Sequence, residues 1–228
     1  MQEGRNKGID YLRGGFILLI FISHSADFDV IGSQSIWGAA GVTGFFILSG
    51  FLYCDTNKAK RYNNNLWKGC LDEVVKFFAK FYPFYFVMLC VYAFIRPGTY
   101  VDFIKCIFLS QSFWGNVDTA MSFNGNAWFL SSLMFCYAIA PILNKLIRNM
   151  YCVNLAILMV GAFLIQLMIP LIIWGAEFNV GYYWVYICPF VRALDFFEGM
   201  LLAMVIKYRS NNESFLLKAE RIFGGLSF

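Results

Sequence analysis

Long apolar runs, separated by short polar stretches, are the feature that most limits what this 228-residue chain can fold into. A helix needs about 20 apolar residues to cross the hydrocarbon core of a bilayer, and several runs approach or exceed that length. Hydrophobic residues make up 60% of the sequence and charged residues 14%, whereas soluble domains average about 45–50% and about 25%. We therefore expect an all-α membrane protein whose main partner is the lipid bilayer.

The runs predict a polytopic bundle of about six or seven transmembrane helices. A further segment, 103–114, contains Lys105 and is too short to cross, so we expect it to be re-entrant or interfacial. Pro189 is expected to kink the last span. No repeat or linker divides the chain, and 1–228 is expected to form a single transmembrane domain. The clearest spans lie near 12–31, 36–53, 78–95, 127–144, 153–175 and 182–206.

Lysine and arginine residues predict the orientation of this layout. Fifteen of the 18 fall in segments that the six spans place on one side, and the opposite loops hold only Arg96 and Lys105. Because basic residues accumulate in cytoplasmic loops, both termini are predicted to be cytoplasmic. The same pattern explains the positive net charge without a nucleic-acid partner. The basic segments are 1–13, 54–80, 144–152 and 207–228.

The first apolar run carries two ionisable residues, Arg13 and His24, which lie eleven positions apart. At about 100° and about 1.5 Å per residue, both project from one helix face, roughly 16 Å apart along the axis. Asp27 follows His24 at i+3, where a carboxylate can hold one imidazole tautomer. A lone histidine is often structural, but an ionisable residue inside a membrane span is by default a functional candidate. His24 is the only histidine in the chain.

The second apolar run, 38–53, has small residues at Gly38, Gly41, Gly44 and Gly50. Small residues on one side of a membrane helix let a neighbouring helix backbone approach closely. This spacing predicts a tight helix–helix contact.

The last span carries Arg192, Asp195 and Glu198 on a stripe about 120° wide. Arg192 and Asp195 are close enough in sequence to pair. Because a charge at the centre of a membrane helix costs about 2.5–3.5 kcal/mol, these side chains must face protein or a water-filled cavity. A structural ion pair and a wall of a substrate cavity are both consistent with this pattern.

The pattern GIDYLRG, the ten residues between Arg13 and His24, and the later FFILSGF resemble the integral-membrane acyltransferase 3 family. The resemblance covers the N-terminal two-thirds of that family, so the chain is expected to be C-terminally incomplete relative to it. It implies an O-acyltransferase of the bacterial inner membrane. Such an enzyme moves an acyl group, expected to be acetyl, from acyl-CoA to a hydroxyl of a carbohydrate or lipid-linked glycan. Acyl-CoA is then a co-substrate, and no bound cofactor or metal is expected.

The resemblance also implies roles for individual residues. Neutral His24 would be the general base, Asp27 would orient its ring, and Arg13 would bind negative charge on the CoA donor. The segment KFFAKFYP resembles the family's basic segment before the third span, which makes Lys76 and Lys80 candidates for the CoA phosphates. The alternative for these lysines is anchoring at a membrane surface rich in anionic lipid.

Trp128 opens a stretch that resembles the family's W-x-L signature, and Asn126 just before it is expected to cap the helix. The candidate substrate-binding residues are this tryptophan and the three charged residues of the last span, namely Trp128, Arg192, Asp195 and Glu198. For Trp128 the alternative is an interfacial or packing aromatic.

Two other functions fit the same residues. A transporter or flippase would use His24, Arg13 and the charges of the last span to line a path for an anionic or glycan solute, although no inverted repeat of broken helices is evident. A catalytically silent, truncated relative is the other alternative. The seven scattered cysteines show no ligand spacing and are interpreted as small apolar side chains.

Overall fold

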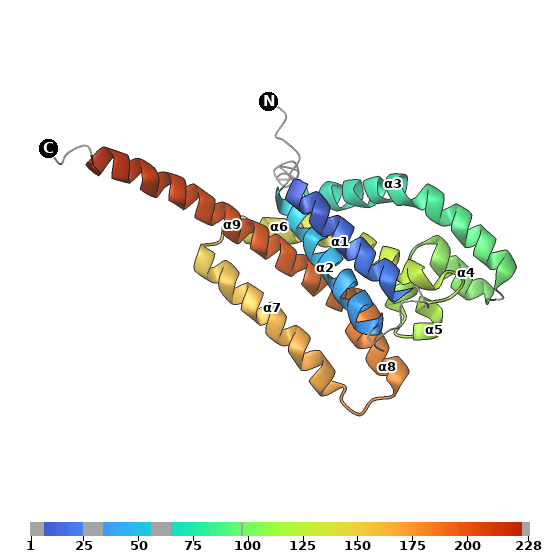
Figure 1. Cartoon of the computed structure of the whole chain (residues 1–228). Coiled ribbons are helices and arrows are strands. Elements are labelled where there is room, and N and C mark those ends of the chain that lie inside the picture. The colour runs from blue at the N-terminus through green and yellow to red at the C-terminus, as the bar shows by residue number, and fades with distance from the viewer. Residues whose placement is uncertain (1–6, 25–33, 56–64, 97, 225–228) are drawn as a thin grey trace.

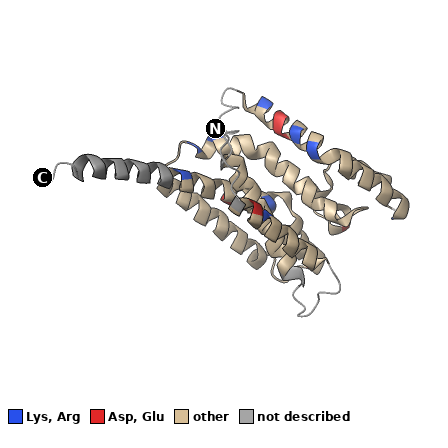
Figure 2. Cartoon of the chain, turned by 45° about the horizontal axis from the view of Figure 1, so that its top comes forward, with Lys and Arg blue, Asp and Glu red and all other residues tan. Residues whose placement is uncertain are grey.

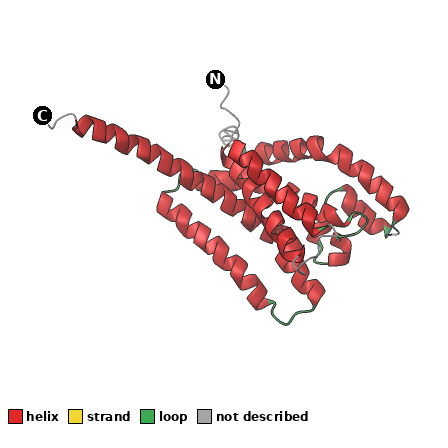
Figure 3. Cartoon of the chain, viewed as in Figure 1, coloured by secondary structure: helices red, strands yellow, loops and turns green. Residues whose placement is uncertain are grey.

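The computed structural model describes residues 7–24, 34–55, 65–96 and 98–224, and only the backbone of 7, 34–36, 55 and 209–224. Within these residues every element is a helix and there is no strand (Figures 1 and 3), so the predicted all-α class is confirmed. In chain order the elements are α1 (Lys7–Ser23), α2 (Gln34–Asp55), α3 (Leu66–Ile95), α4 (Tyr100–Ile107), η3 (Gln111–Phe113), α5 (Val117–Ala120), η4 (Gly125–Ala127), α6 (Trp128–Ile147), α7 (Cys152–Ile172), α8 (Phe178–Tyr182), η5 (Tyr183–Ile187) and α9 (Pro189–Gly224).

Four of the described helices are long and apolar enough to cross a membrane. The predicted count of six or seven is not confirmed. The helix α1 has 17 residues, or about 26 Å, which is shorter than the roughly 30 Å hydrocarbon core. The helix α9 carries three charged residues in its first three turns. The four candidate spans are Trp37–Cys54, Leu66–Ile95, Gly125–Ile147 and Cys152–Ile172.

Two predicted boundaries differ from the structure. The first span was expected to reach residue 31. The helix α1 ends at Ser23, His24 lies in the turn that follows, and residues 25–31 lie outside the described residues. The helix α3 begins twelve residues before the predicted start at 78. Its polar first turns are helical because the side chain of Asn65 caps them, accepting a hydrogen bond from the backbone N–H of Lys68 at 3.0 Å. An apolar run therefore marks only the lipid-facing part of such a helix.

The predicted last span is interrupted at Pro189 rather than bent as one continuous helix, because Cys188 is not helical and Pro189 is the first residue of α9. The preceding element η5 is a single π-helical turn, in which the N–H of Cys188 donates to the carbonyl of Tyr183 at 2.8 Å. Proline is tolerated at the start of a helix, where its missing N–H has no intrahelical partner. The predicted span 182–206 is therefore two helical pieces joined at Cys188.

The segment 103–114 forms no helix of membrane length, since α4 has eight residues and spans about 12 Å. Its buried polar side chains attach it to the start of α6. Gln111 donates to the carbonyl of Ala127 at 3.2 Å, and Ser112 donates to the carbonyl of Trp128 at 3.0 Å. Irregular backbone at membrane depth persists only where protein surrounds it and satisfies its polar groups. This segment therefore fixes where α6 begins.

The helices α2 and α9 make the closest contact in the bundle, and two glycines allow it. A Cβ atom on Gly50 would overlap the carbonyl oxygen of Phe196, and one on Gly199 would overlap the carbonyl oxygen of Ile47. The close approach predicted for the glycines of the second run is thus confirmed. On another side of α2 lies α1 (Figure 1). There Gly38, Gly41 and Gly44 face Ser23, Ile20 and Phe16.

Candidate active site

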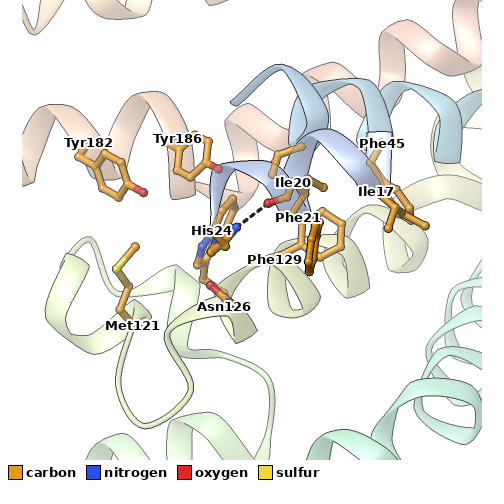
Figure 4. A pocket seen from close by; sticks show the side chains of 12 residues that line it. Ile17, Ile20, Phe21, His24, Phe45, Met121, Asn126, Phe129, Tyr182 and Tyr186 are labelled. Atoms are coloured by element: carbon orange, nitrogen blue, oxygen red, sulfur yellow. Dashed lines mark hydrogen bonds between the residues drawn. The ribbon is translucent and has the colours of Figure 1, made fainter. Parts of the chain in front are cut away.

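His24 lies at the end of α1, where its imidazole folds back on the helix. Its Nδ1 lies 2.7 Å from the carbonyl oxygen of Ile20, one of the last carbonyls of the helix without an intrahelical partner (Figure 4). A carbonyl oxygen only accepts hydrogen bonds, so Nδ1 carries a proton, and in the neutral ring Nε2 is the nitrogen that keeps a lone pair. The Ser23 hydroxyl donates to the same carbonyl at 2.7 Å. The histidine is exposed, and its tautomer suits it to act as a base.

Two cavities meet at His24. Cavity A has a volume of about 500 Å³ and cavity B of about 860 Å³, and His24, Tyr182 and Tyr186 line both. The remaining walls of cavity A come from Ile17, Ile20, Phe21, Val42, Phe45, Met121, Asn126, Trp128 and Phe129. Those of cavity B come from Ser23, Gly38, Ala39, Ala40, Thr43, Ala176, Glu177, Phe178, Gly181 and Val185.

One face of α1 forms a continuous wall of cavity A. The wall residues Ile17, Ile20, Phe21 and His24 follow the i, i+3, i+4, i+7 spacing of a single helix face. Arg13 lies one turn before Ile17 on this face, and its side chain is exposed. Cavity A therefore lies along the stripe that leads from Arg13 to His24, as the sequence spacing of these two residues suggested.

Asn126 does not cap α6 as predicted. The side chain of Asn124 instead caps η4, accepting a hydrogen bond from the N–H of Asn126 at 3.3 Å. The Asn126 side chain is exposed and lines cavity A. Figure 4 shows Asn126, Met121, Tyr182 and Tyr186 around the same space as the imidazole. Sequence reasoning missed Tyr182, Tyr186 and Met121, which come from distant segments without a motif.

Trp128 is 4% exposed, so it is a packing residue that also forms part of the wall of cavity A. Its ring centroid lies 4.9 Å from that of Tyr186 and 6.2 Å from that of Phe129. The structure therefore brings Trp128 and His24, two predicted site residues, to the same cavity.

Arg192 and Asp195 form the predicted ion pair at 2.7 Å, and both are buried. The guanidinium also donates to the Thr43 hydroxyl and to the carbonyl of Val185, each at 2.9 Å. Gln166 of α7 donates to the other carboxylate oxygen of Asp195 at 2.9 Å. Neither charged residue lines a cavity, but Thr43 and Val185 line cavity B. The pair lies behind this wall and connects α2, α7, η5 and α9.

The lysine candidates lie on α3, away from both cavities. Lys76 forms an ion pair with the buried carboxylate of Glu73 at 2.8 Å, and the ammonium of Lys80 lies 4.8 Å from the centroid of the neighbouring phenylalanine ring. Charged residues gather on this first half of α3 (Figure 2). The helix α3 packs against α6, and the ring of Phe77, between the two lysines, lies 6.0 Å from that of Tyr137 in α6, measured between centroids.

The last two candidate site residues, Glu198 and Asp27, are not placed at either cavity by the structure. Glu198 lies one turn beyond Asp195 on α9, is half-buried and lines neither cavity. Asp27, the predicted partner of the His24 ring, lies outside the described residues. Among the described residues, no three histidine, cysteine, aspartate or glutamate side chains are grouped so that they could hold a metal ion.

Membrane-length helices and one exposed imidazole of defined tautomer, placed between two cavities, define a polytopic membrane protein with a candidate general base. Residues 6–228 match the family Acyl_transf_3, described as an acyltransferase domain. The match spans nearly the whole chain, and the protein therefore belongs to this acyltransferase family. Comparison with curated proteins finds no match, and comparison with solved structures finds none either.

Proposed function

We propose that the protein transfers an acyl group, with acetyl as the first candidate, from acyl-CoA to a hydroxyl of a carbohydrate or lipid-linked glycan. One observation carries the proposal beyond family membership. The 2.7 Å hydrogen bond from His24 Nδ1 to Ile20 leaves Nε2 of the neutral ring without a partner among the described residues, at the point where the two cavities meet. Histidine is the side chain that most readily exchanges a proton near neutral pH.

In this mechanism the acceptor hydroxyl gives its proton to Nε2 of His24 while its oxygen attacks the thioester carbonyl carbon. The new carbon–oxygen ester bond forms and the carbon–sulfur bond breaks. CoA leaves as a thiolate, which then takes the proton from the imidazolium. General-base assistance of this kind contributes about 10²–10⁴ in rate. Asp27 is proposed to orient the ring.

The donor is proposed to lie along cavity A. Arg13 at one end of the stripe would bind a phosphate of CoA, and His24 at the other end would face the thioester. The hydrocarbon side chains of Ile17, Ile20 and Phe21 suit the flexible arm of the donor. Lys76 and Lys80 of α3 would add positive charge for the polyanionic donor.

The acceptor side is proposed to include Trp128, which lines cavity A, as His24 does. Arg192 and Asp195 are proposed to support the wall of cavity B rather than to contact substrate, because their hydrogen bonds are made to protein groups. Glu198 is proposed to act with them through α9.

We place the protein in the bacterial inner membrane with both termini cytoplasmic, which the distribution of lysine and arginine supports. In this orientation α1 runs outward from Arg13, and the two cavities lie toward the external ends of the helices. Cysteine labelling of intact cells tests it at two exposed positions. A membrane-impermeant reagent should label Tyr100→Cys and should label Trp67→Cys only after lysis. The opposite result would invert the layout.

The proposed reaction is tested with purified protein, acetyl-CoA and a panel of glycans, by measuring the release of CoA thiol and the mass of the product. His24→Ala should lower the rate per folded molecule by about 10²–10⁴-fold. Leu18→Ala is the matched control, because Leu18 is exposed on α1 and lines neither cavity. A folded His24→Ala protein with the wild-type rate would exclude the mechanism.

A further inference from the structure

Cavity B differs chemically from cavity A. Its wall contains the hydroxyls of Ser23 and Thr43 and the carboxylate of Glu177. Small residues from the first turns of α2, Gly38, Ala39 and Ala40, form another part of that wall. Both walls are mainly apolar, but among the described residues no carboxylate lines cavity A. The two sides of His24 therefore suit different ligands.

Glu177 has a carboxylate with no hydrogen bond or ion pair to the part of the chain that the structure describes. The residue precedes α8, and its backbone carbonyl accepts a hydrogen bond from Gly181 at 3.0 Å. Its side chain makes no capping hydrogen bond, and no ion-pair partner for it exists among the described residues. An ionised carboxylate has two oxygens that only accept hydrogen bonds. It is therefore available to a ligand that offers hydroxyl donors.

A row of aromatic rings leads from Glu177 to the imidazole. The rings of Phe178 and Tyr182 are stacked, with centroids 5.8 Å apart and planes at 19°. The centroids of Tyr182 and Tyr186 are 5.1 Å apart, and Tyr186 lines the cavity beside His24. Aromatic faces offer a flat apolar surface with polar groups at its edge. Such a surface suits the C–H face of a sugar ring, while the neighbouring oxygen atoms suit its hydroxyls.

We propose that cavity B is the acceptor subsite and that Glu177 selects a neutral, hydroxyl-bearing pyranose ring against an acidic one. A ligand carboxylate or phosphate beside Glu177 would meet like charge, which costs affinity. The same charge keeps the polyanionic donor out of cavity B and directs it to cavity A. The inference rests on the proposed function, because the sugar bound in cavity B is an acyl acceptor only if the protein transfers acyl groups. The binding of the sugar ring can be measured separately.

The experiment reads occupancy of each cavity from the labelling rate of one engineered cysteine. Five of the seven native cysteines are buried, so a Cys90→Ala, Cys152→Ala background should label slowly. Ala40→Cys reports on cavity B and Ile17→Cys on cavity A, because both positions are exposed. The probes are the methyl glycosides of glucose, galactose and mannose, each paired with its uronic acid.

At least one neutral glycoside should slow maleimide labelling of Ala40→Cys and leave Ile17→Cys unchanged. Its uronic acid partner should need about tenfold higher concentration for the same protection, and added salt should narrow the difference. Glu177→Gln should remove most of the discrimination. Asp118→Asn, which removes an exposed carboxylate of α5 that lines neither cavity, should retain it. Acetyl-CoA should protect Ile17→Cys and not Ala40→Cys.

The inference is overturned if no neutral glycoside protects Ala40→Cys, or if neutral and acidic partners protect equally in the wild-type background. In that case Phe178 and Tyr182 are simply aromatic residues of the membrane interface. Labelling needs no turnover, so sugar protection without acyl transfer would refute the proposed reaction and leave the subsite standing. Acyl transfer to a glycan without protection of Ala40→Cys would refute the subsite alone.

Discussion

Two groups of ionisable side chains in the helical bundle, His24 and the Arg192–Asp195 pair, differ in their surroundings. His24 is exposed at the end of α1, with Nδ1 bound to Ile20 and Nε2 without a partner among the described residues. Arg192 and Asp195 are 6% and 2% exposed, and they bind each other and three protein groups. The cost of placing a charge in a membrane protein is therefore a poor guide to function by itself. The hydrogen-bonding capacity that the fold leaves unused is more informative.

This difference predicts opposite responses to mutation. Removal of the uncommitted imidazole should change the rate of reaction and little else, because the surrounding protein needs it only as one helix-end contact. Removal of one member of the buried pair should change stability, because its partner then remains charged in a water-poor site.

The largest effect is expected for His24. In His24→Ala, free imidazole added to the assay should restore part of the lost activity, because a small base can occupy the vacated space beside cavities A and B. The thermal unfolding temperature of the variant should stay close to the wild-type value. Imidazole should not accelerate Leu18→Ala, the control on the same helix. An unfolded or aggregated His24→Ala protein, with normal specific activity in its folded fraction, would assign the histidine a structural role.

The second effect concerns the buried pair. Asp195→Ala should destabilise the folded protein by about 3–5 kcal/mol, since it leaves Arg192 without its counter-charge. Thermal unfolding in detergent measures this loss. The double variant Arg192→Met, Asp195→Leu should recover much of it, because no buried charge is then unpaired. If Asp195→Ala unfolds at the wild-type temperature but loses activity, the Arg192–Asp195 pair takes part in the reaction as His24 does. The pair would then not be a structural one.

A smaller loss is expected where α2 meets α9. Gly50→Ala places a Cβ atom against the backbone carbonyl of Phe196, so the helices must separate slightly. Overpacking of this kind costs about 1–3 kcal/mol. It should also weaken the hydrogen bond from Arg192 to Thr43 across the same contact. Gly161→Ala is the control, because a Cβ there meets nothing within 4 Å. Equal thermal stability of the two variants would contradict the close contact.

The smallest effect belongs to a third charge pair, Asp102 and Lys105 in α4, whose N–O distance is 3.0 Å. A hydrogen bond from the Thr99 hydroxyl, and then Lys105, lower the pKa of Asp102 below its ordinary value. The pair therefore contributes stability above the unfolded-state pKa of about 3.9, and this contribution disappears as the pH falls through the lowered folded-state pKa. Asp102→Asn should cost about 1 kcal/mol or less at neutral pH.

Thermal unfolding of the wild type and Asp102→Asn across this pH range checks the sign of the effect. The two curves should differ at neutral pH and converge in acid. A difference that grows as the pH falls would show that the pKa of Asp102 is raised instead. If Asp102→Asn lost as much unfolding free energy at neutral pH as Asp195→Ala does, the difference in solvent exposure would not explain how much each ion pair stabilises the protein.

Several features of the site could be predicted because they depend on one helix at a time. The Arg13–His24 stripe and the Arg192–Asp195 pair follow from helical periodicity, and the close contact at Gly50 follows from small residues on one face. Asn126 was misassigned as a helix cap, because the true cap, Asn124, depends on the 3₁₀ turn that precedes α6. Boundaries failed at Ser23 and Leu66 for a related reason, since caps and turns, rather than hydropathy, end a helix.

The sequence by itself determined the helical class, the family, the imidazole on an apolar stripe and the burial of the charges in the last helix. Each of these depends on residue type and on spacing within a few turns. Only the tertiary structure decided that Asn126, Glu177, Tyr182 and Tyr186 line the cavities that meet at His24, and that Arg192 lies behind a cavity wall. A cavity is the space that packed helices leave between them, so its lining depends on contacts between residues more than a hundred positions apart. Local periodicity carries no information about such contacts.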